Sequence, residues 1–468
     1  DYVANLRLIL VPIFNVDGHE RESVYNRFTQ VGPDSGFGTR RNALTLDLNR
    51  DFAKLETPEC QALVRLASEF QPHIYVDLHT DDGMGHQYDI LFSPAVNPTF
   101  PGERDALVRK RLAPYLVQSM EERGFLSRWI GWPANSLDLS KGIVGYGIST
   151  RLSTGYFETR QCISILSEAY PYKPYERRVR ASDAFVRSIL DFAATNRIDV
   201  CEAIDGARSK AIEWAQETGR HTIALGCRAD RERGHEIAWQ GKRFDVIMSE
   251  ITGRRYPLYS EEDLTYNLPF FDKMLPRATA VMPHGYLMDA AFEHVAETLR
   301  RHAINVRRLS EPFECDVDIY RIKSASFQEQ PYQGHHPLSD IEGAWSTEKR
   351  LFPAGTYWIP LAHPAGLTAM HLLEPESADA LLVWNAFDTI FERGIILERW
   401  ALEENARDLL EDETIRREYE EALADSAFAA DPNARLEFFF QKTPYVEERE
   451  RLYPVFRVLH GGPVKLAP

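Results

Sequence analysis

The sequence predicts an α/β protein in which a mixed, mostly parallel sheet is flanked by helices, followed by a second α/β domain with an acidic helical C-terminus. Short apolar, β-branched runs alternate with helical segments through the first 200 residues, which is the pattern of a parallel or mixed sheet. The length of 468 residues, with 44% apolar and 26% charged residues, is enough for two globular domains that each bury a core.

The first region contains three expected strands separated by helices. The apolar run 6–14 predicts a buried strand that opens into the turn at 15–18. Thr57-Pro58 predicts a helix start, and Pro72 predicts its end. The run 73–79 predicts a second strand whose polar end feeds a loop. The remaining expected elements are a basic helical segment (103–123), an irregular stretch (124–160), a strand (163–170) and a helix (176–195).

The second region is expected to be another α/β unit with a helical end. We place the boundary near 197–207, which gives domains 1–200 and 201–468. Met288, Phe292, Val295 and Leu299 would share one face of a helix. The other expected elements are strands at 222–226, 245–249, 279–283 and 304–308 and acidic helices over 398–425.

Charge excludes some partners. The chain has 54 Lys and Arg against 70 Asp and Glu, a net charge of −16, so it repels nucleic-acid phosphates and anionic lipid headgroups. No apolar run reaches the length of a bilayer span, and the five cysteines form no C-x-x-C pair, so a thiolate metal site is not indicated. We expect neither a nucleic-acid nor a membrane partner.

Two side chains point to chemistry. His79 lies at the end of an expected strand, where open α/β sheets place ligand-binding groups. Glu168 ends an otherwise apolar strand, where burying a carboxylate is costly unless a cation pairs with it. Either a buried salt bridge or a general base with a shifted pKa would account for Glu168.

Five motifs in order resemble the zinc carboxypeptidase family, the carboxypeptidase A-like metallopeptidases. They are LILVPIFNVDGHE (8–20), TRRN (39–42), DLNRDF (47–52), DLHTDDG (77–83) and ILSEAYPYKPY (165–175). Two later segments, 352–364 and 371–388, are similar to the C-terminal extension of large bacterial members.

The resemblance implies a role for each matching position. His79 would be a zinc ligand, Glu168 the general base that activates a zinc-bound water, Arg40 the group that polarises the scissile carbonyl, Asn49 and Arg50 the holders of the substrate's terminal carboxylate, and Asp47 the carboxylate that orients a ligand imidazole. A capping tyrosine is expected at Tyr156, which we favour, or at Tyr146. An Arg fork suits bidentate capture of a carboxylate, and a catalytic zinc takes three protein ligands and a water.

The chief departure from the family is the first pair of metal ligands. The family's H-x-x-E motif comes before the strand expected at residue 6, so we expect it to lie in a segment that precedes Asp1. Three H-x-x-E matches occur elsewhere and are not expected to bind zinc: His19/Glu22, His294/Glu297 and His371/Glu374. His86, a candidate for the rim of the site, is expected to be solvated.

The sequence therefore predicts a zinc metallocarboxypeptidase that acts on peptides with a free C-terminus. The resemblance also implies a secreted or periplasmic location. Two alternatives stay open: a zinc-dependent amide deacylase on the same scaffold, and a non-catalytic peptide-binding module that lacks a complete zinc site. Side-chain preference is not readable, because the irregular stretch that would carry it does not align.

Overall fold

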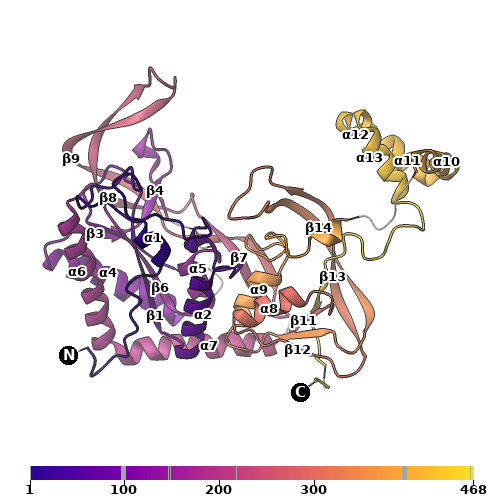
Figure 1. The fold of residues 1–468 in the computed structure, drawn as a ribbon, viewed down its shortest axis with the longest axis horizontal. Coiled ribbons are helices and arrows are strands. Elements are labelled where there is room, and N and C mark those ends of the chain that lie inside the picture. The colour runs from indigo at the N-terminus through magenta and orange to yellow at the C-terminus, as the bar shows by residue number, and fades with distance from the viewer. Residues whose placement is uncertain are drawn as a thin grey trace.

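The structure is a computed structural model. It describes residues 2–95, 102–145, 147, 149–217, 219–392, 398–463 and 465–467. The N-terminal region (up to residue 200) and the C-terminal region (from residue 201) lie side by side. Helices α10–α13 of the C-terminal region (within 399–440) stand apart from the rest of the molecule at one end (Figure 1).

A four-stranded mixed sheet forms the centre of the N-terminal region. Its order is β1-β6-β2-β3, with β1 parallel to β6, β6 antiparallel to β2, and β2 parallel to β3. The strands are β1 (Ile74–Thr80), β2 (Ile90–Pro94), β3 (Ser127–Trp129) and β6 (Ile163–Ala169). The expected α/β class, with a mixed sheet flanked by helices, is confirmed.

Helices cover this sheet and connect its strands. They are α1 (Val16–Glu20), the 3-10 helix η1 (Leu48–Arg50), α2 (Pro58–Phe70), α3 (Glu103–Leu107), the π-helix η2 (Val108–Leu112), α4 (Ala113–Glu122), the 3-10 helix η3 (Leu139–Lys141), α5 (Ser153–Thr159), α6 (Tyr175–Thr195) and α7 (Arg197–Gln216). Thr57 caps α2 through its side chain, Pro58 occupies its first turn, and Gln71 ends it in the left-handed region with φ 45°, as the sequence indicates. Phe185 and Ile189 of α6 pack on Phe92 and Ile165 of the sheet.

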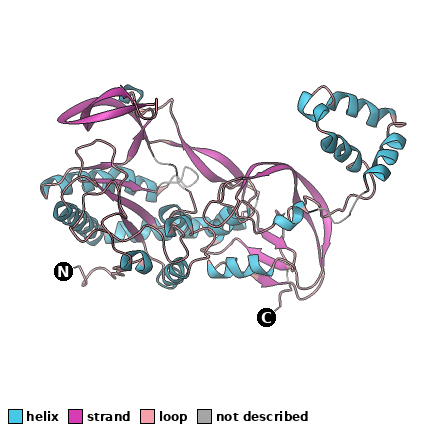
Figure 2. Ribbon diagram, turned by 45° about the horizontal axis from the view of Figure 1, so that its top comes forward, coloured by secondary structure: helices cyan, strands magenta, loops and turns pink. Residues whose placement is uncertain are grey.

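The C-terminal region is built mainly from antiparallel strands (Figure 2). A six-stranded sheet has the order β12-β15-β11-β16-β13-β14, β8 and β9 form a long hairpin that pairs with β5 of the first region, and β10 pairs with β7. The first region contributes β4 (Gly131–Pro133) and β5 (Ile143–Gly145). The strands of the C-terminal region are β7 (Thr222–Ala229), β8 (His235–Met248), β9 (Arg255–Phe271), β10 (Met274–Val281), β11 (Gly285–Met288), β12 (Arg307–Arg308), β13 (Phe313–Phe327), β14 (Leu338–Phe352), β15 (Tyr357–Pro360) and β16 (Val455–Val458).

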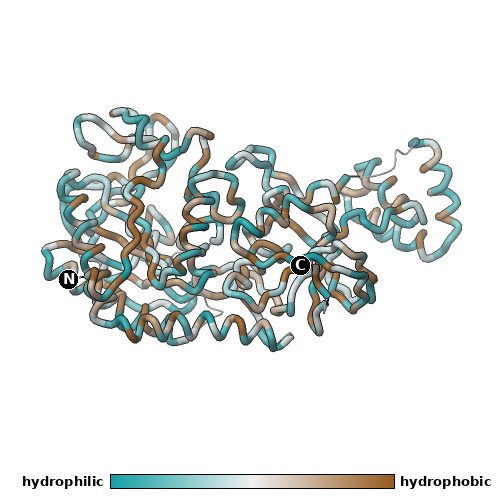
Figure 3. The backbone as a smooth tube through the Cα atoms, turned by 60° about the horizontal axis from the view of Figure 1, so that its bottom comes forward, coloured by the Kyte–Doolittle hydropathy of each residue, from teal (hydrophilic) through white to brown (hydrophobic). Residues whose placement is uncertain are grey.

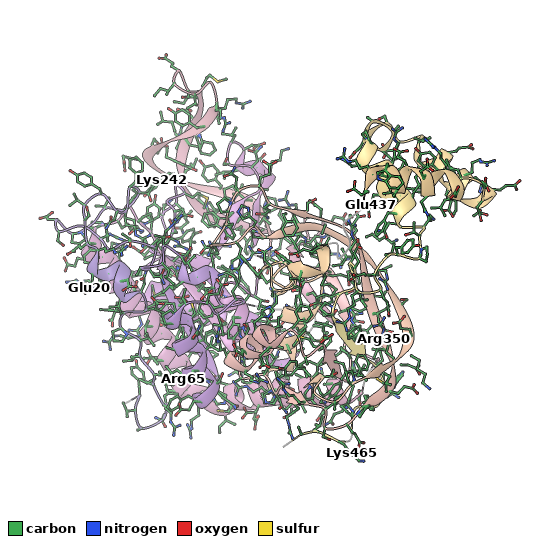
Figure 4. The ribbon with its side chains drawn as sticks, turned by 45° about the vertical axis from the view of Figure 1, so that its right-hand side comes forward. Glu20, Arg65, Lys242, Arg350, Glu437 and Lys465 are labelled. Carbon is green, nitrogen blue, oxygen red and sulfur yellow. The ribbon has the colours of Figure 1, made fainter. Side chains whose placement is uncertain are left out.

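The remaining helices include the acidic C-terminal ones. They are α8 (Glu293–Arg301), α9 (Gly366–Leu373), the 3-10 helix η4 (Asp388–Phe391), α10 (Arg399–Leu409), α11 (Glu413–Ala422), α12 (Ser426–Ala430) and α13 (Pro432–Phe440). Figure 4 shows this helical group, with Glu437 labelled, beside the body of the molecule. Among the helices that the structure describes, none combines the length and apolar character needed to cross a bilayer.

The two regions share cores, so each supports the other. Ala53 of the first region and Ala211 and Ala215 of α7 lie in the same buried cluster as the six-stranded sheet. Helix α7 runs through the expected boundary at 197–207 and lies beneath both regions (Figure 1). The division into domains at residue 200 stays a prediction.

Three expected elements are wrong in place or type. The run 6–14 forms no strand: Leu10 is 78% exposed and Leu8, Ile9, Val11 and Ile13 are 39–46% exposed. Among the described residues no strand lies against this run, so its backbone has no ladder to join. Met288 ends β11 and α8 begins only at Glu293. The expected strand at 304–308 is reduced to Arg307–Arg308, because residues 304–306 approach the sheet as a loop.

Apolar residues otherwise follow the sheets and the helix faces turned toward them. Figure 3 shows apolar stretches concentrated in the body of the molecule, while the C-terminal helical group alternates polar and apolar residues. The candidate residues lie in loops and strand ends of this apolar body.

Candidate active site

One carboxylate holds two guanidinium groups at the loop before α2. Asp47 caps η1 by accepting from the amide of Asn49 at 3.0 Å. Its Oδ2 accepts from Arg40 Nε at 2.7 Å and lies 3.9 Å from Arg50 Nη1. Burial opposes the charge of Arg40, but the adjacent Asp47 carboxylate outweighs it and raises the Arg40 pKa. Asp47 thus fixes two cations that stay partly exposed, with 45% and 28% of the side chains of Arg40 and Arg50 accessible.

The amide of Asn49 is oriented by the first turn of α5. The Ser153 backbone N–H, one of the donors that a helix start leaves without a helical partner, donates to Asn49 Oδ1 at 2.8 Å. Because a backbone donor must face the amide oxygen, the Nδ2 group of Asn49 remains available as a donor. Ser153 Oγ also donates to Asp77 Oδ2.

His79 and Glu168 lie side by side at the ends of β1 and β6. The two strands are parallel and in register, with His79 paired with Glu168. Asp77 lies two residues before His79, on the same face of β1, and its Oδ2 is 3.0 Å from His79 Nε2.

Burial and neighbouring charges shift the pKa values of these groups. Burial raises the pKa of Glu168 to about 7; the charge of His79 opposes this, and Asp81 and Asp77 add to it. Burial lowers the pKa of His79, but the Asp77 carboxylate outweighs it and raises the value to about 9. Burial likewise raises the pKa of Asp77, and His79 more than reverses that effect.

The charges of the Arg40–Asp47–Arg50 group and of the His79–Glu168 pair interact. The charge of Glu168 contributes to the raised pKa of Arg40, and the charge of Arg40 acts on His79. Glu168 Oε2 is inaccessible to solvent and has no hydrogen-bond partner among the described residues. The structure therefore brings His79, Glu168, Arg40, Asn49 and Arg50 together at one edge of the sheet, as the motifs predicted, while their roles stay predictions.

The residues around His79 match a metal site only in part. His79 resembles a metal ligand in one respect, since metal-binding imidazoles commonly give their second nitrogen to a carboxylate, here Asp77. Within the described part of the chain, however, no group of three His, Cys, Asp or Glu side chains is arranged to hold a metal ion. These residues do not make a zinc site.

His86 is not solvated, contrary to expectation. Its ring is 1% exposed, its Nε2 lies 3.0 Å from Asp81 Oδ2, and it packs on Tyr170 with ring centroids 4.2 Å apart. The loop 81–86 folds back on itself, so that a polar side chain near the site becomes a buried partner of Asp81. His86 thereby fixes a carboxylate that raises the pKa of Glu168.

Tyr156 is not brought into the cluster. It is 1% exposed and packs on Phe52 and Phe157. Its hydroxyl accepts from Arg160 at 2.9 Å and lies 3.1 Å from His302 Nδ1. Capping a substrate would require this side chain to leave a packed core, so the placement does not fit the role given to Tyr156. Tyr146 lies outside the described residues.

The H-x-x-E matches have other partners. His371 Nδ1 lies 3.2 Å from Thr150 Oγ1, and Glu374 accepts from Tyr286 and Arg457 inside the C-terminal core. His294 contacts the carbonyl of Ala386.

Sequence reasoning missed Asp77 and Ser153. Asp77 had a usable signal, because residues two apart on a strand share a face and Asp77 precedes His79 by two. Ser153 had none, since its contacts with Asn49 and Asp77 depend on how the segment 149–153 folds back over β1.

The fold and cluster define an α/β protein with a candidate acid–base and anion-binding site. No protein-family model matches the chain. Carboxypeptidase 2 of Trichophyton rubrum is 22% identical over 376 residues, which cover 75% of this chain and 64% of that protein. The match thus spans less than two thirds of the relative. A crystal structure of a metallo-carboxypeptidase from Burkholderia cenocepacia aligns with a TM-score of 0.26 and 15% identity, over 35% of this chain and 43% of that one, a likeness too low to bear on fold or function.

Proposed function

We propose that the chain carries the substrate-binding and proton-transfer groups of a carboxypeptidase, which removes residues from the free C-terminus of peptides. The observation that carries the proposal is the junction of two cations and an oriented amide with a carboxyl group of shifted pKa at one sheet edge. The name of the Trichophyton rubrum relative supports a peptidase in general terms.

Arg50 and Asn49 would bind the terminal carboxylate of the peptide. Arg50 Nη1 donates to the carbonyl oxygen of Asn49 at 2.7 Å. The other guanidinium nitrogens of Arg50 have no hydrogen-bond partner within the described part of the chain. A guanidinium edge and an amide donor suit the two oxygens of a carboxylate. Asp47 keeps the Arg50 fork in place without neutralising both cations.

Glu168 would act as the general base, and Arg40 would stabilise charge on the scissile carbonyl. A base with a pKa near the working pH is the most effective, and burial raises that of Glu168 to about 7. Oε2 is buried, so in this proposal Oε1, the other oxygen of the carboxyl group, accepts the proton. Arg40 and Arg50 both lie beside Oδ2 of Asp47; in this proposal Arg50 holds the terminal carboxylate and Arg40 faces the bond to be cleaved.

We propose a metal cofactor, zinc above all, in addition to these groups. His79 could contribute one ligand, and the others would have to come from residues outside the described set. None of the roles above depends on a step at the metal.

The test compares a fluorescent pentapeptide with a free C-terminus and the same peptide as its amide. Free-acid binding should exceed amide binding in the wild type, and Arg50→Ala should weaken the acid by roughly tenfold to a hundredfold, as expected for a lost charged hydrogen bond, with little effect on the amide. Arg65→Ala, an exposed arginine of α2 labelled in Figure 4, is the matched control. Equal binding of both peptides by the wild type would contradict the proposal.

A non-catalytic peptide-binding module is the second candidate. It is favoured by the lack of a three-ligand metal group among the described residues. Mass spectrometry of the peptide after incubation with protein and Zn²⁺ separates the two: release of the last residue supports the peptidase, and tight binding without release supports the module.

A further inference from the structure

Asp379, a buried carboxylate of the C-terminal region, accepts hydrogen bonds from the segment 149–151, which precedes α5. Asp379 is 2% exposed. Its Oδ2 accepts from Ser149 Oγ at 2.5 Å and from the Arg151 amide at 3.0 Å, and its Oδ1 accepts from Arg151 Nε at 2.6 Å. Both oxygens are therefore used on one short stretch of chain, in charge-assisted contacts that are stronger than neutral ones.

Two more side chains of the C-terminal region hold the same segment. The Arg151 guanidinium lies over the Trp384 ring, 5.2 Å from its centroid, and Thr150 contacts the buried His371. Three consecutive residues, 149–151, are thus fixed from the C-terminal region.

The segment leads directly into the candidate site. Ser153, two residues after Arg151, orients the Asn49 amide through its backbone N–H and holds Asp77 through its hydroxyl. The Arg151 carbonyl also accepts from the amide of Phe52, at the end of the loop that carries Asn49. A shift of this segment would move the Asn49 amide and the Asp77 carboxylate together.

A second contact joins the C-terminal region to the same loop. Gln333, in the turn between β13 and β14, accepts from the Asp47 amide at 3.0 Å. The loop is thus held at Asp47 from one side and, through Ser153, at Asn49 from the other.

We infer that Asp379 is a positioning residue for the carboxylate-binding group: through residues 149–151 it fixes Ser153, and through Ser153 it sets the direction of the Asn49 amide donor. The inference rests on the proposed function, since it assigns Asn49 to the peptide's terminal carboxylate. It makes the C-terminal region part of the site's specificity for a free C-terminus, although Asp379 itself touches no substrate.

The experiment measures the ratio of Kd for the amidated pentapeptide to Kd for the free acid in the full chain. Asp379→Asn keeps the size of the side chain but places an NH₂ group against donors. We expect the ratio to fall by at least about fivefold, through weaker binding of the acid alone. The control is Glu376→Gln, an exposed acid three residues away, which should leave the ratio unchanged.

Amide hydrogen exchange supplies a second measurement. Exchange over 149–153 should speed up in Asp379→Asn while β1 and β6 keep their protection. Should that variant fail to fold, Ser149→Ala, which removes one of the three donors, replaces it with the same expected direction.

The outcomes separate the two hypotheses. A wild type that does not distinguish acid from amide would overturn the proposed carboxylate site and this inference with it. A wild type that distinguishes them, with a ratio unchanged in the folded Asp379 or Ser149 variant, would overturn the positioning role alone.

Discussion

His79 and Glu168 occupy paired positions on neighbouring parallel strands, so that an imidazole and a carboxyl group meet at the end of the sheet. Both pKa values are raised, for different reasons: His79 has the Asp77 carboxylate at 3.0 Å, whereas Glu168 is buried and its Oε2 has no partner in the described part of the chain. A protonated imidazole, that of His79, thus lies next to the carboxyl group of Glu168, whose pKa is near neutrality.

Removing the Glu168 carboxyl group should abolish proton transfer but spare binding. Glu168→Gln keeps the size of the side chain, so kcat for a free-acid peptide should fall by roughly 10²–10⁴-fold while Kd for the same peptide stays within about twofold. Kinetics and fluorescence titration on one preparation check both values. Undiminished turnover would remove Glu168 from the mechanism.

The rate should rise with pH through neutrality. Because the folded-state pKa of Glu168 is about 7, the base form is scarce at pH 5 and dominant at pH 9. A profile of kcat/KM against pH should show an acid limb near 7. A limb near 4.5, the ordinary range for glutamate, would mean that burial does not control this group.

The His79–Asp77 pair should stabilise the fold below pH 9. The pKa of His79 is raised to about 9, so its contribution is fully present below the unfolded value near 6.5 and is lost as pH rises through 9. Asp77→Asn should lower the free energy of unfolding at pH 6 by on the order of 2 to 3 kcal/mol, and much less at pH 10. Urea titrations at the two pH values measure the difference; an equal loss at both would indicate packing rather than charge.

His302 should make the junction of the two regions acid-sensitive. Its Nε2 must donate to the carbonyl of Ala53 at 3.1 Å, which leaves Nδ1 to accept from the Tyr156 hydroxyl. Burial lowers the pKa of His302 to about 3, so the unfolded chain binds the proton first and stability falls as pH drops from 6.5 toward 3. Proton NMR should show this imidazole neutral at pH 5; a charged ring there would contradict the prediction.

Breaking the buried ion pair of the C-terminal core should cost more than removing it. Glu374 is fully buried, accepts from Arg457 Nε at 2.9 Å and from the Tyr286 hydroxyl at 2.6 Å. Glu374→Leu alone should destabilise the chain by roughly 3–5 kcal/mol, because it leaves Arg457 buried without a partner. The double variant with Arg457→Met should recover part of the loss, which a thermal denaturation cycle would measure.

Patterns within short stretches of sequence predicted the site residues that lie at strand ends and in the loop before α2. Strand periodicity and the loop motifs located His79, Glu168, Asn49 and Arg50, and Thr57-Pro58 located the start of α2. What the sequence left out depends on contacts between distant segments: Asp379 meets Arg151 across 228 positions, and Tyr156 is enclosed by packing against Phe52. The strand predicted at 6–14 is absent because β propensity makes a strand only where a neighbouring strand supplies the hydrogen bonds.

The exposed run 6–13 also bears on how the protein behaves at high concentration. An exposed, β-prone stretch that pairs with no strand among the described residues can pair with its equivalent in a second molecule. The net charge of −16 keeps molecules apart at low ionic strength, but salt shortens the range of that repulsion to about 10 Å at 0.1 M. Colloidal stability is thus a balance between long-range charge repulsion and pairing of this exposed run, and added salt should shift it toward self-association.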